Sequence, residues 1–205
     1  MSQEQTSYPI SITGELTIPP SRGWWLLKWL LGIPHYIILV FLWAAFIVVH
    51  IIAFFAILIT AKYPRSLFDF NVGVLRWTWR VGFYSYQALG TDKYPPFSLA
   101  SDDNYPADLQ VPYPERLTRG LVLIKWLLAI PHGLIVSVFQ GGWGEKNTGL
   151  TLVLAIFGAV ALLFTGKYPP DIFKLVVGMN RWSYRVTTYI AMMTDRYPPY
   201  RLWDD

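Results

Sequence analysis

Three histidines are the residues of this 205-residue chain best suited to haem or metal chemistry. His35 and His132 each follow a proline, within the matching strings Ile33-Pro34-His35 and Ile130-Pro131-His132. Two matching imidazoles could ligate a haem iron from both sides, since His is a common axial ligand. The commoner role is a hydrogen bond inside a helical bundle, and it is the one we expect. His50 has no counterpart elsewhere and is a poor ligand candidate.

Paired arginines are the best candidates for binding an anion. Arg76 and Arg80 are four residues apart, as are Arg181 and Arg185, so each pair shares one helical face. Aromatic residues surround both pairs, and an arginine stripe beside a wide aromatic face is typical of a helix lying in the membrane interface. We therefore expect interfacial helices over 66–89 and 174–193, because arginines inside a spanning helix would be costly.

On this hypothesis the arginines bind lipid phosphates, or serve only as snorkelling anchors. The predicted headgroup-binding residues are Arg76, Arg80, Arg181, Arg185, Lys62 and Lys167, and the predicted interface anchors are Trp29, Trp77, Trp126 and Trp182.

Catalytic constellations are hard to assemble from the other polar residues. The chain has no cysteine, which excludes disulfides, thiol catalysis and cysteine metal sites. None of its thirteen Asp and Glu lies within an apolar segment, which disfavours a proton or cation pathway. Asp92 and Asp195 follow Thr in turn-like segments, where Asp usually bonds local backbone. No nucleophile elbow or phosphate loop occurs, so we expect no catalytic residue, no metal and no cofactor.

The composition is that of a membrane protein. Hydrophobic residues make up 54% of the chain and charged residues 15%, against about 45–50% and about 25% in soluble domains. The mean hydropathy is positive, at +0.35. With ten Trp and a net charge of +4, we expect the chain to contact anionic lipid headgroups rather than nucleic acid. The N-terminal stretch is polar and has no hydrophobic core, so we expect no cleaved signal peptide.

The chain contains the same unit twice, over 8–99 and 105–202. Lys28-Trp29-Leu30-Leu31 returns as Lys125-Trp126-Leu127-Leu128, and Arg76-Trp77 returns as Arg181-Trp182. The spacing of matching residues grows by eight between these two strings, at the polar segment 141–147.

These extra residues indicate a helical hairpin in the second copy, with apolar arms over 121–139 and 150–164. The first copy is apolar without a break over 24–60, about 55 Å as one helix and too long for a ~30 Å bilayer core. We expect it to fold back near 43–45, although bending or lying partly in the interface are alternatives. Of the seventeen Lys and Arg, only Lys146 lies in a hairpin loop, so the positive-inside rule predicts parallel hairpins with both termini cytoplasmic.

Short alternating stretches begin and end each copy. Those over 10–13 and 108–111 are compatible with half-buried strands. Those over 97–99 and 200–202 follow Tyr-Pro-Pro and are expected to pair with the opening strand of their own copy.

The repeated strings resemble a bacterial membrane-protein family catalogued as domain of unknown function 4389. The resemblance rests on the Lys-Trp-Leu-Leu-x-Ile-Pro-His opening, the Lys-Tyr-Pro and Arg-Trp-x-x-Arg middle, and the Thr-Asp-Lys/Arg-Tyr-Pro-Pro ending. It covers nearly the whole chain twice and implies a duplicated integral membrane protein, without implying an activity, a substrate or site residues.

The sequence therefore predicts an all-α, multi-pass protein of the bacterial cytoplasmic membrane. Its two tandem repeats each hold a membrane hairpin, an amphipathic interfacial helix and short extended segments. We expect a non-enzymatic scaffold or accessory subunit of a larger membrane complex, in contact with anionic lipids. The alternatives are a lipid-handling protein that uses the arginine pairs, and a haem-binding subunit that uses His35 and His132.

Overall fold

The computed structural model describes residues 8–17, 19–142 and 148–203, and it is mostly helical. The elements in chain order are β1 (Ser11–Gly14), the 3₁₀ turn η1 (Trp24–Leu27), α1 (Lys28–Thr60), α2 (Arg65–Tyr84), β2 (Ala107–Gln110), α3 (Arg119–Leu128), α4 (Ile130–Gln140), α5 (Leu150–Thr165) and α6 (Pro170–Ile190).

The first apolar segment is one continuous helix, so the predicted fold-back near 43–45 is wrong. Helix α1 runs for 33 residues and continues through Pro34. Trp43, Ala44 and Ala45 are all compatible with helix, and no glycine pair or polar run interrupts them. The helix ends at Thr60 and is followed by Ala61, whose backbone is left-handed with φ of 59°, and Pro64 precedes α2.

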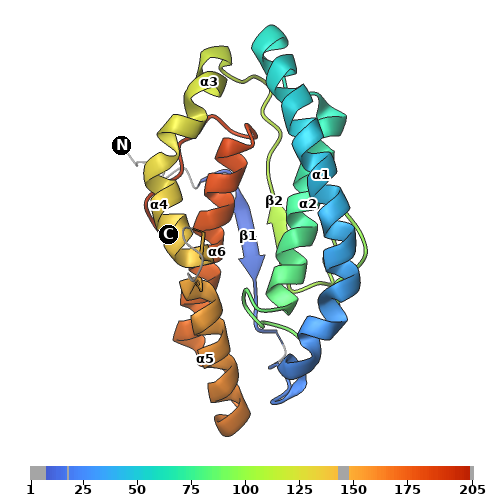
Figure 1. Cartoon of the computed structure of the whole chain (residues 1–205), viewed down its shortest axis with the longest axis vertical. Coiled ribbons are helices and arrows are strands. Elements are labelled where there is room, and N and C mark those ends of the chain that lie inside the picture. The colour runs from blue at the N-terminus through green and yellow to red at the C-terminus, as the bar shows by residue number, and fades with distance from the viewer. Residues whose placement is uncertain (1–7, 18, 143–147, 204–205) are drawn as a thin grey trace, which may run out of the picture.

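Helices α3, α4 and α5 together occupy in the second repeat the place of α1. The chain bends by 49° between α3 and α4. It leaves the helical path after Gln140 and returns at Gly149, where a Cβ atom would lie only 2.5 Å from the carbonyl carbon of Gln140. Helix α5 thus continues in the direction of α4 instead of folding back against it, and the predicted hairpin is wrong (Figure 1). Most of that predicted loop, over 143–147, lies outside the described residues.

The two repeats run in opposite directions, which corrects the prediction of parallel repeats. The backbone N–H of Leu117, before α3, donates to the carbonyl of Ala61, after α1, at 2.9 Å. At the other end, the Arg22 guanidinium, before α1, lies against Gly166, after α5. In Figure 1, α1 rises from its blue start to its cyan end while α3, α4 and α5 descend. We call α1 one apolar path and the succession α3, α4 and α5 the other. Each apolar path therefore starts at the end of the fold where the other one ends.

Three layers position the side chains. Helices α2 and α6 form the middle layer: α2 packs against α1 and β2, while α6 packs against α4, α5 and β1 (Figure 1). The strands β1 and β2 pair with each other, antiparallel, with Ile12 opposite Leu109. The two predicted opening strands therefore exist, but the closing stretches 97–99 and 200–202 are not strands. Their predicted pairing with the opening strands is wrong, because β1 and β2 pair with each other.

The arginine-bearing helices are internal, so their prediction as interfacial helices is also wrong. Nearly every residue of α2 from Asn71 to Tyr84 is buried, and α6 is buried over the corresponding stretch. Their aromatic side chains fill the core between the outer helices and the sheet rather than facing lipid.

The outer layer leaves apolar side chains uncovered. The segment Trp24–Thr60 is long and apolar enough to cross a membrane, and the bent pair α3–α4 also qualifies if counted as one span. Only 17% of the most apolar window of Trp24–Thr60 is buried, unlike the core helix of a soluble protein. Phe41 and Ile59 are 70% and 71% exposed.

Candidate functional site

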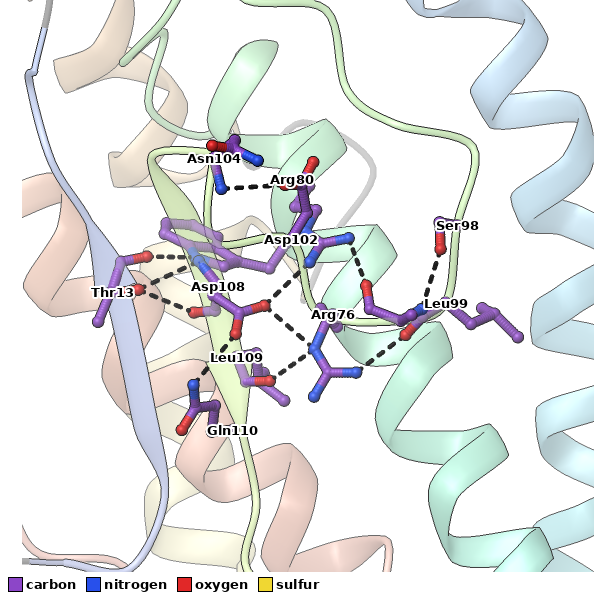
Figure 2. Close-up of polar contacts among 12 residues, drawn as sticks. Thr13, Arg76, Arg80, Ser98, Leu99, Asp102, Asn104, Asp108, Leu109 and Gln110 are labelled. Carbon is purple, nitrogen blue, oxygen red and sulfur yellow. Dashed lines mark hydrogen bonds and ion pairs between the residues drawn. The ribbon is translucent and has the colours of Figure 1, made fainter.

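The arginine pair of α2 converges on one carboxylate from β2. Asp108 Oδ1 lies 3.1 Å from both Arg76 Nε and Arg80 Nη2 (Figure 2). The Arg80 side chain has no exposed surface, and those of Arg76 and Asp108 are 14% and 15% exposed. Because β2 belongs to the second repeat, this ion-pair cluster joins the two repeats.

Backbone carbonyls accept further hydrogen bonds from this pair. Arg76 donates to Leu99 O at 2.9 Å and to Leu109 O at 3.0 Å, and Arg80 donates to Ala100 O at 2.8 Å (Figure 2). Both guanidinium groups therefore hold the chain after Tyr-Pro-Pro against α2. They face the sheet and not the outer layer, which contradicts their predicted contact with headgroups.

The second repeat repeats this arrangement with a different strand residue. Arg181 donates to Ile12 O of β1 at 3.3 Å and to Leu202 O at 3.4 Å. Arg185 is fully buried, donates to Arg201 O at 3.2 Å and lies over the Tyr8 ring. Ser11 occupies the position in β1 that Asp108 occupies in β2. These arginines too are turned inward, against the prediction.

The remaining predicted lipid contacts divide into two groups. Lys62 and Lys167 are exposed, but they follow α1 and α5 and so lie at opposite ends of the fold, away from the arginine pairs. Trp29 and Trp126 are exposed on α1 and α3, as anchors would be.

Trp77 and Trp182 are buried, so their prediction as interface anchors is wrong. Their indole nitrogens donate to Nδ1 of His35 and His132, at 3.0 and 2.9 Å.

Each matching histidine is held within its own aromatic cluster. His35 stacks on Phe97 with ring centroids 4.1 Å apart, and His132 stacks on Tyr200 at 4.0 Å. Both imidazoles are fully buried, with Nδ1 accepting from Trp. This geometry fits packing and hydrogen bonding better than haem ligation, because a ring neighbour already covers a face of each imidazole. His50 instead stacks on Phe46 of its own helix.

An ion pair between a buried lysine and a partly exposed aspartate in each repeat was not predicted. Lys28 Nζ lies 2.7 Å from Thr91 O and 3.0 Å from Asp92 Oδ1. Lys125 makes the same contacts with Thr194 and Asp195, at 2.7 and 2.8 Å. The signal was present in the sequence, since each partner lies in a string that occurs in both copies. Each ion pair connects the first helix of a repeat to the segment that ends the same repeat.

The carboxylates of these pairs are stabilised in their charged form. The second Asp92 oxygen accepts the Ser21 backbone N–H at 2.6 Å, and that of Asp195 accepts the N–H of Thr118 at 2.6 Å. Burial raises the pKa of each carboxyl, but the hydrogen bonds from backbone and lysine outweigh it, so both pKa values lie below the usual 3.8.

The comparison with known families matches both repeats. The sequence model of the family described as "Domain of unknown function (DUF4389)" matches residues 23–98 and 119–201. The chain belongs to the DUF4389 family. No curated protein and no solved structure matches it. Each DUF4389 copy contains its own lysine–aspartate pair and histidine–tryptophan pair, whereas β1 and β2 lie outside the matched ranges.

A groove of about 760 Å³ lies between the two DUF4389 copies. The middle of α1 forms one wall, the junction of α4 and α5 forms the other, and the C-terminal half of α2 with Tyr86 and Gln87 forms the floor. Its described lining is mostly apolar and includes no Lys, Arg, His, Asp or Glu. Within the described part of the chain, no group of three His, Asp or Glu is arranged to hold a metal.

Proposed function

We propose that this chain is a non-enzymatic membrane scaffold whose outer layer, α1 with α3, α4 and α5, lies along a single leaflet. The observation that carries the proposal is the exposed apolar face of that layer. Large apolar side chains are uncovered along the whole of α1 and recur on α3, α4 and α5. A soluble monomer rarely exposes an apolar patch of more than a few hundred Å².

The length of α1 favours an orientation in the plane of the membrane. Its 33 residues measure about 50 Å, against a bilayer core of about 30 Å. An upright helix would leave exposed apolar residues in water at one end or both, since Trp29 and Ile59 are both uncovered. Fitting within the core would need a tilt of more than about 50°, beyond the usual range of about 0–40°.

The distribution of basic residues supports the same orientation. Arg22 and Lys167 lie at one end of the antiparallel pair of apolar paths, whereas Lys62 and Arg119 lie at the other. If the paths stood upright, one basic end would face the outside, against the positive-inside rule. If they lie in the plane, all four side chains reach the same surface, where anionic headgroups of the cytoplasmic leaflet attract them.

The layer farthest from lipid is then the polar one. The strands and the connecting residues Asp102, Asp103 and Asn104 lie on the far side of α2 and α6. Both ends of the described chain, Tyr8 and Trp203, contact α6 rather than the outer layer and would face the cytoplasm. This proposal replaces the predicted four crossings and retains the predicted cytoplasmic termini.

A scaffold role is supported by how the charged residues are used. The inward-facing arginines and lysines of both repeats bind backbone segments and partly exposed aspartates, which gives a rigid body on the membrane rather than a catalytic cluster. The haem alternative gains no support from the packed histidines. Lys62 and Lys167 remain candidates for headgroup contact, because both are exposed beside the ends of the apolar paths.

Depth measurements along α1 test the orientation. Single spin labels at Leu30→Cys, Phe41→Cys and Ile59→Cys lie on the outer face of α1, near its start, middle and end. In-plane binding places all three at one depth, about 5–10 Å below the headgroups. Gln110→Cys, at the exposed last residue of β2, is the matched control and should stay in water. A profile with only Phe41 deep would instead show an upright helix.

A further inference from the structure

The groove between the repeats holds two buried polar atoms that have no hydrogen-bond partner. These are the Thr151 hydroxyl, at the start of α5, and the Gln87 side-chain oxygen, on the groove floor. Thr151 is 2% exposed and Gln87 Oε1 has almost no accessible surface. An unpaired buried polar group is costly, so native structures rarely leave one without a partner.

Several other polar side chains of the groove form hydrogen bonds within the protein. Thr78 donates to Val74 O and accepts the Trp43 indole N–H, and Ser85 donates to Val81 O. Gln140 donates to Asn180 and Ser183 of α6. Among the described groove residues, Thr151 and Gln87 therefore hold the buried side-chain polar atoms that have no hydrogen-bond partner.

We propose that this groove binds a neutral lipid that carries a free hydroxyl group, such as a diacylglycerol. A hydroxyl can donate to the Gln87 carboxamide oxygen and accept from the Thr151 hydroxyl. The apolar walls from α1 and the α4–α5 junction suit acyl chains, and about 760 Å³ is within the range of small-molecule sites. The described lining holds no Lys or Arg to pair with a phosphate, which favours an uncharged headgroup.

Access to the groove rests on the proposed function. The groove opens between α1 and the α4–α5 path, the elements that are proposed to lie against the leaflet. A lipid would then enter sideways from the leaflet without crossing water.

Photo-cross-linking with a defined lipid tests the proposal. The full chain is reconstituted in phosphatidylcholine vesicles that contain a trace of diazirine-labelled diacylglycerol, and cross-linked peptides are mapped. We expect labelling within 36–47 and 150–152, displaced by unlabelled dioleoylglycerol. A diazirine-labelled phosphatidylglycerol should label these peptides much less.

Two substitutions separate binding from folding. Thr151→Val removes an unpartnered hydroxyl at constant shape, so folding is maintained while diacylglycerol labelling falls about three- to tenfold. Ala44→Phe fills the groove from α1 and should nearly abolish labelling. The controls are Thr60→Val, whose hydroxyl bonds Ala56 O within its own helix, and Val48→Phe, on the outer face of α1.

The outcomes distinguish the two proposals. Equal labelling of wild type, Thr151→Val and Ala44→Phe would overturn the groove proposal, even if spin-label depths still place α1 in one leaflet. Preferential labelling of the groove by phosphatidylglycerol would also overturn it, because the headgroup would then be charged. An upright depth profile with groove labelling intact would overturn the orientation alone.

Discussion

Removing the carboxylate of Asp108 should destabilise the fold through the arginines that it joins. Asp108→Ala leaves Arg80 buried with a carbonyl partner and no counter-charge, and it removes the ion pair of Arg76. Breaking a buried ion pair costs about 3–5 kcal/mol. Slight exposure of Asp108 and Arg76 places the expected loss of unfolding free energy at the lower end, about 3 kcal/mol.

The loss can be measured by unfolding the purified chain in mild detergent. At about 2–4 °C per kcal/mol for a chain of this size, the Tm should fall by roughly 6–12 °C. Asp103→Ala is the matched control, because Asp103 is exposed in the same connecting region and should change stability by no more than about 0.5 kcal/mol. In an Arg80→Met background, Asp108→Ala should cost less, since the buried charge is already gone.

The alternative function of the arginines gives the opposite pattern. If Arg76 and Arg80 bind headgroups, Asp108→Ala would leave the Tm close to that of Asp103→Ala. Arg76→Met would then weaken binding to phosphatidylglycerol vesicles without lowering the Tm. That combination would refute the assignment of the arginines as internal links between the repeats.

Two further predictions concern the paired motifs. Because the pKa values of Asp92 and Asp195 are lowered in the fold, their stabilisation is complete above about pH 5 and is lost as pH falls through those lowered values. Asp92→Asn should reduce the loss of stability at acid pH, measured by pH-jump unfolding. An unchanged dependence of stability on acid pH would contradict the pairing of Asp92 with Lys28. Trp77→Phe removes the donor to His35 Nδ1 and should cost about 1–3 kcal/mol, measured by chemical unfolding. Exposed Trp29→Phe should cost far less, and equal losses would show that the hydrogen bond contributes nothing.

The repeat and the two opening strands could be predicted, since both depend on local patterns of residues. The path of the apolar segments could not. Eight extra residues in one copy are equally compatible with a hairpin turn or with an excursion from a straight helix. Only the return of the chain at Gly149 to the position of Gln140 distinguishes them.

The arginine helices were predicted correctly as helices and wrongly as surface elements. Their partners are backbone carbonyls at 99, 100 and 109, together with Asp108, and no spacing within a helix indicates such partners. The free-energy cost of burying an arginine favours placing it at the membrane interface only when the protein offers no carboxylate or carbonyl partner inside. Lys28 and Asp92 could have been paired in advance, because opposite charges recur together in both copies.

The in-plane orientation of the antiparallel repeats is the central claim, and two glycines allow a direct measurement. Gly23 and Gly120 are equivalent positions at opposite ends of the fold, and a Cβ atom at either would meet no other atom within 4 Å. The chain has no cysteine, so Gly23→Cys and Gly120→Cys each provide one thiol for a membrane-impermeant maleimide.

Labelling is compared between intact cells and inverted membrane vesicles. If α1 and the α3–α5 path lie along the cytoplasmic leaflet, both variants react in inverted vesicles and neither reacts in intact cells. If one variant reacts only from outside and the other only from inside, the paths cross the membrane upright in opposite directions, and the proposed orientation is wrong.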